Sequence, residues 1–201
     1  GSAKRLAIVP HQSLHFFPFA ALPNADGNLI DTFALHYLDS ATVARFLTGG
    51  KKSRVGAETR VLAMASPVPG VEVSALPFAA REPEVIGRYF EKVTAARGEA
   101  ATEALVRADG TRFDIVHVAS HAEFKPTDPG ESRLLLSPGG GQDGYLSVNE
   151  MFTMSMEADL VTLSACDTGL GKLTLADEII GMNRALQYAG ARTVVTSLWR
   201  I

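Results

Sequence analysis

Residues 158–171 read ADLVTLSACDTGLG and contain Cys166, the only cysteine of the 201-residue chain. A largely apolar run at residues 160–165 leads directly into this cysteine, and Asp167, Thr168 and Gly169 end it. Such a run is typical of a strand that is buried on both faces of a parallel sheet. Ligands bind beyond the carboxyl ends of strands in these sheets. We therefore expect the Cys166 thiol to face a binding crevice.

A second stretch, FDIVHVASHAEF at residues 113–124, has the same organisation. Its predicted strand at residues 115–119 runs out at Ser120 and His121, and polar sequence follows. If the two strands are parallel neighbours, His121 and Cys166 reach the same edge of one sheet. An imidazole beside a thiol promotes the reactive thiolate. The pair is therefore a candidate base and nucleophile.

The fold class follows from the alternation of predicted elements after residue 60. Strands alternate with helices along this part of the chain, which favours an α/β fold with a parallel sheet and right-handed crossovers. Local signals support the boundaries: Ser147 with Glu150 is typical of a capping box, and Gly190 of a helix end. Strands are predicted at residues 61–65, 115–119, 134–136, 160–165 and 192–199, and helices at 80–96, 102–108 and 175–189.

Composition excludes several classes of function. The net charge is −3 and Lys and Arg are scattered, so neither a nucleic-acid footprint nor a polybasic membrane surface is indicated. An apolar fraction of 46% suffices for a core. No apolar run approaches about 18 residues, so we expect a cytoplasmic protein without a membrane contact. One cysteine cannot form an internal disulfide.

Each candidate also has a purely structural interpretation. Cysteine is among the most buried residue types, so Cys166 could be a core side chain, although its place at a strand end favours a functional thiol. His117 lies four residues before His121 on the same side of the strand, and we interpret it as a hydrogen-bonded core residue supporting the site. A zinc site is disfavoured because the histidines lie on a strand, and we expect no metal or cofactor. Asp167 could orient His121 or line a pocket, but such an acid more often caps a turn.

Together these motifs resemble the CHAT domain, a caspase- and separase-related cysteine peptidase family often associated with tetratricopeptide repeats. The resemblance covers nearly the whole chain, so we expect a single CHAT-like domain over residues 1–201, with residues 1–2 a cloning scar. The family's repeats and C-terminal end would be absent. The resemblance to the CHAT domain rests on five motifs: IVPHQSLHFFPFAAL at 8–22, FDIVHVASH at 113–121, GYLSVNEM at 144–151, LSACDTGLG at 163–171 and AGARTVVTSLW at 189–199.

The resemblance implies a caspase-like sheet flanked by helices on both faces, and a dyad of His121 as base and Cys166 as nucleophile. It also implies that the backbone amides of Ala122 and Cys166 bind the oxyanion; the family usually has glycine at position 122, and alanine keeps the amide. Substrates would be proteins or peptides, and a repeat domain a regulatory partner. Ser197 and Trp199 could join Asp167 in walling a substrate pocket. The alternative is a catalytically silent interaction module.

Overall fold

The structure is a computed structural model, and it describes residues 4–42, 55–66, 76, 78–108, 112–125, 127–164, 172–173 and 179–196. The chain divides into two compact units. One comprises Gly1–Lys51 with Leu173–Ile179, and the other comprises Lys52–Lys172 with Ile180–Ile201. The second unit carries the motifs described above, except the N-terminal motif at residues 8–22, which belongs to the first unit.

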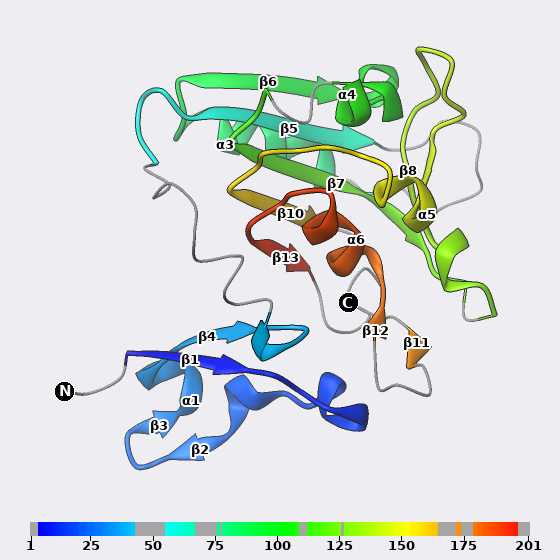
Figure 1. Cartoon of the computed structure of the whole chain (residues 1–201). Coiled ribbons are helices and arrows are strands. Elements are labelled where there is room, and N and C mark those ends of the chain that lie inside the picture. The colour runs from blue at the N-terminus through cyan, green and yellow to red at the C-terminus, as the bar shows by residue number, and fades with distance from the viewer. Residues whose placement is uncertain are drawn as a thin grey trace. The chain divides into compact units, whose positions relative to one another are not determined.

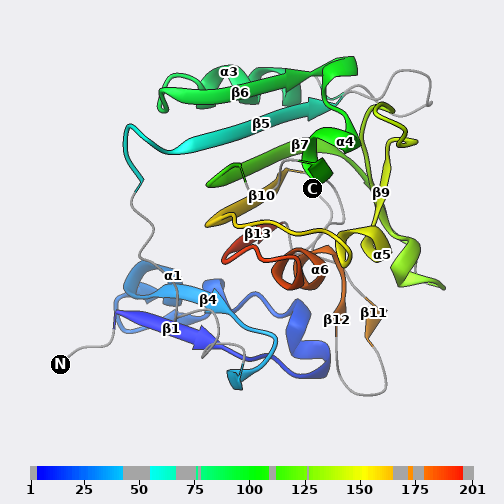
Figure 2. The same cartoon turned by 45° about the horizontal axis from the view of Figure 1, so that its top comes forward.

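The second unit is organised around five parallel strands in the order β13-β10-β7-β5-β6 (Figures 1 and 2). Their arrowheads point to the same side of the sheet (Figure 1), so their carboxyl ends share one edge. β10, which comes before Cys166 in the sequence, is the direct parallel neighbour of β7, which carries His121. The bounds are β5 Arg60–Ser66, β6 Lys92–Arg97, β7 Ile115–Glu123, β10 Leu160–Ser164 and β13 Val194–Thr196.

Beyond the parallel part, β7 continues into an antiparallel extension. Its last three residues pair with β8 (Arg133–Leu135), which pairs in turn with β9 (Tyr145–Ser147). Together these strands complete a seven-stranded sheet. The 3-10 turn η5 (Pro129–Glu131) lies between β7 and β8. The strand predicted at residues 134–136 is thus present, shifted by one residue.

One face of the sheet carries the main hydrophobic core. Alternate strand residues, among them Leu62, Val116 and Val161, are at most 1% exposed and pack in one apolar cluster with three helices. Every second residue belongs to this cluster because successive strand side chains point to opposite faces of the sheet. The three helices are α4 (Glu103–Ala108), α5 (Val148–Met151) and α6 (Met182–Tyr188).

The opposite face is covered by the 3-10 turn η3 (Ala79–Arg81) and helix α3 (Glu82–Ile86), which contact β5. The side chains of Val61, Ala63 and Ala65 on this face are fully buried. Helices therefore flank the sheet on both faces, which confirms the predicted α/β class.

The helix predicted over residues 80–96 is wrong. It ends at Ile86, and Lys92–Arg97 forms the edge strand β6 in parallel register with β5. The apolar spacing that suggested one long helix does not describe a buried stripe, because Val85 is 44% and Tyr89 is 79% exposed. Val93 and Thr94 are β-branched and suit a strand. The 3-10 turn η4 (Gly98–Ala100) then leads to α4.

The local signals near α5 and α6 are confirmed. The Ser147 hydroxyl accepts from the Glu150 amide, while the Glu150 carboxylate accepts from the Ser147 amide, forming the predicted capping box. Gly190 has a φ of +117° and directly follows the helix end. The predicted helix 175–189 is wrong at its start: residues 175–178 lie outside the described part, Ile179–Ile180 form the strand β12 because they pair with β11, and helix α6 begins only at Met182. The predicted strand 192–199 is described to Thr196, and β13 begins at Val194.

The first unit is smaller, and most of its described residues are exposed. Its parallel strands β1 and β4 pair with each other, and β2 and β3 form a hairpin whose turn lies at residues 25–26. The ring of Phe19 contacts those of Phe17 and Tyr37, at centroid distances of 5.0 and 6.3 Å. The elements are β1 Arg5–Ile8, η1 Gln12–Phe16, η2 Phe19–Ala21, β2 Pro23–Asn24, β3 Gly27–Asn28, α1 Leu29–Thr32 and β4 Ala34–Tyr37. A separate pairing joins β11 Lys172–Leu173 to β12 Ile179–Ile180.

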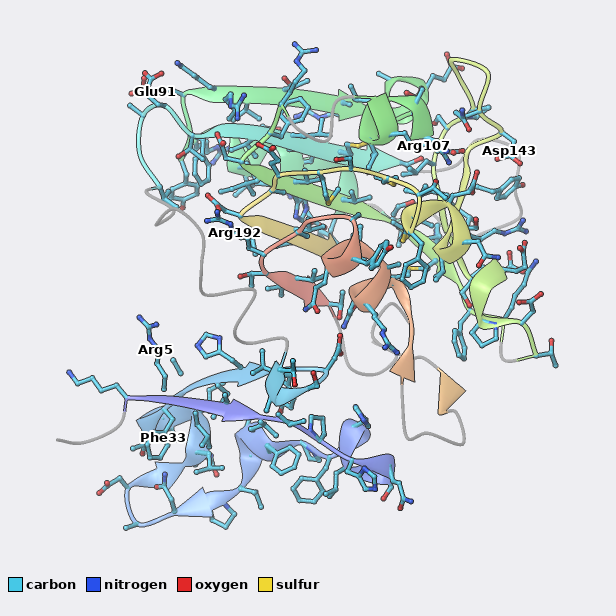
Figure 3. The ribbon with its side chains drawn as sticks, in the orientation of Figure 1. Arg5, Phe33, Glu91, Arg107, Asp143 and Arg192 are labelled. Carbon is cyan, nitrogen blue, oxygen red and sulfur yellow. The ribbon has the colours of Figure 1, made fainter. Side chains whose placement is uncertain are left out.

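Ion pairs mark the two ends of the large sheet. Asp159 pairs with Arg192 at 3.1 Å at the amino-terminal edge, where Figure 3 labels Arg192. At the other end, Arg107 of α4 (Figure 3) contacts both Glu103 and Glu150. Glu103 is fully buried and accepts from the Gly144 amide at 3.1 Å. Burial is the main cause that raises the pKa of Glu103. This group joins α4, α5 and the loop before β9.

Candidate active site

His121 directly follows the last described pairs of the parallel sheet. In the described residues these are Ser120 with Ser66 of β5 and Ala119 with Ser164 of β10. His121 is the first β7 residue that pairs instead with β8, opposite Leu135. It is half-buried. The described structure therefore places His121 toward the carboxyl end of β7, but the prediction that this strand runs out at Ser120 and His121 is wrong, because β8 folds back and pairs with residues 121–123.

Ser120 fixes this point of departure. Its side chain is 1% exposed, and its hydroxyl is placed to donate to the carbonyl of Leu135 on β8 and to that of Ser66 on β5, the latter at 3.4 Å. A buried hydroxyl must find such partners, because leaving it unpaired costs about 1–3 kcal/mol. The residue next to His121 thus holds the ends of β5 and β8 together.

Ala122 adopts ordinary strand backbone. It pairs with Leu134, and its side chain packs against the main hydrophobic core, on the face opposite to His121. Among the described non-glycine residues only Gln12 has a positive φ, so position 122 does not need the conformational freedom of glycine. The methyl group of Ala122 points away from the face that carries His121.

The remaining predicted site residues fall outside the described part of the chain. These are Cys166, Asp167, Ser197 and Trp199. The register nevertheless relates the two motifs. Ala119 and Ser164 are paired, His121 is two residues after Ala119, and Cys166 is two residues after Ser164 in the sequence. Both candidates are therefore separated from one paired position by the same number of residues.

A polar cluster lies on the His121 face of the sheet, and we call it the Glu82 cluster: Glu82, His117, Thr162 and Ser164. The Nδ1 atom of His117 lies 2.6 Å from Oγ1 of Thr162, its register partner on β10. Its Nε2 atom lies 2.8 Å from Oε2 of Glu82, although no well-aligned hydrogen bond is formed there. The Ser164 hydroxyl donates to Oε1 of Glu82 at 3.2 Å. One carboxylate from α3 thus contacts two strands.

His117 is held largely in its neutral form. Its side chain is 13% exposed, and burial is the main cause that lowers its pKa, while the nearby charge of Glu82 acts in the opposite direction. A carboxylate beside Nε2 favours the tautomer with its proton on that nitrogen. Nδ1 then accepts from the Thr162 hydroxyl. The prediction of a hydrogen-bonded, largely buried His117 is confirmed.

The antiparallel extension adds charged and aromatic side chains beside His121. His121, Leu135 and Tyr145 are opposite one another on β7, β8 and β9, so their side chains share a face. Arg133 lies 4.1 Å above the Tyr145 ring centroid and pairs with Glu123 at 2.7 Å. This surface can contact a polypeptide through its apolar ring and its two charges.

Sequence analysis missed Glu82, Arg133 and Tyr145. Glu82 is 35 positions before His117 and belongs to a segment read as an ordinary helix. Its Pro83 at the first helical positions was a signal for a helix start, but nothing local indicated its partners on β7 and β10. Arg133 and Tyr145 approach His121 only because β8 and β9 fold back onto β7.

A comparison with protein families matches the CHAT domain over residues 1–201, the whole chain. The chain belongs to the CHAT domain family. The expected resemblance is thereby confirmed, and with it a relation to caspase-like cysteine peptidases, consistent with the mostly parallel sheet flanked by helices. No curated protein matches this CHAT domain.

No helix within the described ranges is both long and apolar enough to cross a lipid bilayer. In the same part of the CHAT domain, His, Cys, Asp and Glu side chains form no group of three or more suited to a metal ion.

Proposed function

We propose that this CHAT domain is a cysteine endopeptidase in which His121 is the base and Cys166 the nucleophile. The observation that carries the proposal is the register: β7 and β10 are parallel neighbours, and each candidate comes two residues after the paired Ala119 and Ser164. Family membership supports it, because the CHAT domain is related to cysteine peptidases. The substrates would be proteins or peptides.

The proposed reaction has two stages. His121 takes the thiol proton, and the Cys166 sulfur attacks the scissile carbonyl carbon, forming a carbon–sulfur bond and an oxyanion. As the carbonyl re-forms, the carbon–nitrogen bond breaks and the imidazolium gives its proton to the leaving amine. Water, deprotonated by His121, then attacks the thioester carbon. The carbon–sulfur bond breaks, which releases the acid and restores the thiol.

The backbone amides of Ala122 and Cys166 would stabilise the oxyanion. Ala122 suits this role because its side chain packs in the core and leaves the His121 face clear. Removing one such donor typically lowers the rate about 10²–10³-fold. Asp167, Ser197 and Trp199 are proposed to wall the substrate pocket. A tetratricopeptide-repeat partner would supply regulation.

The test is the rate at which peptidyl acyloxymethyl ketones label Cys166 between pH 5 and 9. The sequence does not specify which side chain is preferred before the cleaved bond. Separate ketones therefore carry a basic, an acidic or an amide side chain at that position. We expect rapid labelling at neutral pH, and a loss of about 10²–10⁴-fold in His121→Ala. His36→Ala, on β4 of the other unit, is the matched control and should label like the unaltered protein.

A second candidate function is a catalytically silent interaction module, which would keep the fold without the chemistry. Labelling at the rate of an ordinary thiol, unchanged in His121→Ala, would favour this module and exclude an active dyad in the protein tested.

A further inference from the structure

We propose that Glu82 is a positioning residue of this site: its carboxylate holds His117 on β7 and Ser164 on β10, and so fixes the end of β10 relative to β7. This inference rests on the proposed function. It assigns a role to a residue outside the proposed dyad.

The Glu82 cluster holds two polar side chains of β10. Thr162 and Ser164 are the polar β10 side chains on the His117 face, and they come four and two residues before Cys166. Thr162 contacts Nδ1 of His117 at 2.6 Å, and Ser164 donates to Glu82 at 3.2 Å. Both polar side chains that precede Cys166 on this face are therefore held from the same side.

The Glu82 cluster also includes His117 of β7, the strand next to β10. His117 comes four residues before His121 on β7, and it contacts Thr162 through one ring nitrogen and Glu82 through the other. A tilt or slide of β10 against β7 would break the Thr162 contact, and a shift of α3 would break both Glu82 contacts. The cluster thus cross-links β7, β10 and α3 just before the dyad.

Glu82 of α3 can reach both β7 and β10 because α3 lies close to the sheet. The sheet under η3 and α3 carries Ala63, Ala65 and Ala119, each 0% exposed. These small side chains allow the segment to lie close to the sheet. Pro83 follows Glu82 directly and is buried, which fixes the start of α3. Glu82 is therefore held on a short, well-anchored segment and not on a long flexible arm.

A small displacement of the Cys166 nucleophile is expected to lower the reaction rate strongly. Misplacement of reacting groups by about 1 Å can reduce a rate about 10²-fold. A positioning residue should thus act on the maximal rate of Cys166 labelling and leave the concentration of half-saturation nearly unchanged. A residue that only stabilises the fold would change thermal stability without this division.

The experiment measures both parameters for peptidyl acyloxymethyl ketone labelling in Glu82→Ala and Glu82→Gln. Glu82→Ala should lower the maximal rate about 10- to 100-fold, with little change in half-saturation. Glu82→Gln should restore most of the rate, because its amide can accept from His117 and donate to Ser164. The matched control is Glu84→Ala, which removes an exposed carboxylate of the same helix, paired only with Arg88 at 2.9 Å among the described contacts.

The outcomes separate this inference from the proposed function. Rapid, His121-dependent labelling that is unaltered in a folded Glu82→Ala overturns the positioning role alone. Labelling that does not depend on His121 in the unaltered protein overturns both. If Glu82→Ala does not fold, Ser164→Ala replaces it, because Ser164 is exposed and its loss removes only the β10 contact of the carboxylate. An unaltered maximal rate in Ser164→Ala then overturns the inference.

Discussion

His117 shows how a single buried side chain can make the stability of the CHAT domain depend on pH. Burial lowers its pKa below the ordinary value of 6.5. The unfolded chain therefore binds a proton at this position more readily than the folded chain does. Its contribution to stability is complete above about pH 6.5 and is lost as the pH falls toward the lowered pKa.

We therefore expect His117→Gln to flatten the pH dependence of unfolding between pH 5 and 7. The measurement is the free energy of urea unfolding of both proteins across this range, with His11→Gln, at an exposed position, as the control. Glu103 acts in the opposite sense, because burial raises its pKa and its stabilising effect declines as the pH rises. The difference between variant and parent isolates His117, and parallel curves would contradict the expectation.

At this scale the sequence predicted the hydrogen bonding of His117, because it depends on one strand and its alternation, but it did not predict that β7 continues through His121 to Glu123. It did not predict Glu82 as a partner, because that contact joins segments 35 positions apart. Local patterns report which face a residue occupies. Long-range partners depend on how the helices settle on the sheet.

At the scale of elements, the turn from α6 to β13 depends on Gly190. Its φ of +117° is strained for any residue with a side chain, and a Cβ there would lie 2.0 Å from the carbonyl oxygen of Met156. Gly98 also has a positive φ, +55°, but a Cβ there would meet nothing within 4 Å. The pair therefore separates backbone strain from collision.

Gly98→Ala should lower the free energy of unfolding by about 1 kcal/mol, the cost of the left-handed conformation alone. Gly190→Ala should lower it by about 3 kcal/mol or more, because the backbone of residue 156 must also move. Urea denaturation of both variants checks the difference. Equal losses would mean that the turn yields to the added methyl group without cost.

Elements with a local signature were predicted well, and those that depend on pairing with distant segments were not. The α5 capping box and the Gly190 helix end each reside in a few adjacent residues. By contrast, residues 80–96 contain apolar side chains at helical spacing, yet Lys92–Arg97 pairs with β5 as an edge strand. An edge strand buries little apolar surface, so its alternation is weak and helical spacing can arise by chance.

At the scale of the whole molecule, the two compact units differ in how their strands are protected. In β5, residues 61–66 are 0–1% exposed, and the strand is paired on both sides, by β6 and β7. In β1 and β4 no described residue is buried, and these strands pair only with each other. The sequence predicted one CHAT-like domain over residues 1–201, and whether the units unfold together is what decides that prediction.

Hydrogen exchange followed by mass spectrometry tests whether the two units unfold together. Amides open with free energies that range from near zero up to that of global unfolding, and buried central strands are at the upper end. We expect β5 and β7 peptides to exchange much more slowly than β1 and β4 peptides, because the smaller unit can open while the large sheet stays folded. Equal protection in both units, and equal loss on adding low urea, would instead show one cooperative domain. In that case a destabilising change near β1 would also disturb the Glu82 cluster, and the labelling rate of Cys166 would fall with it.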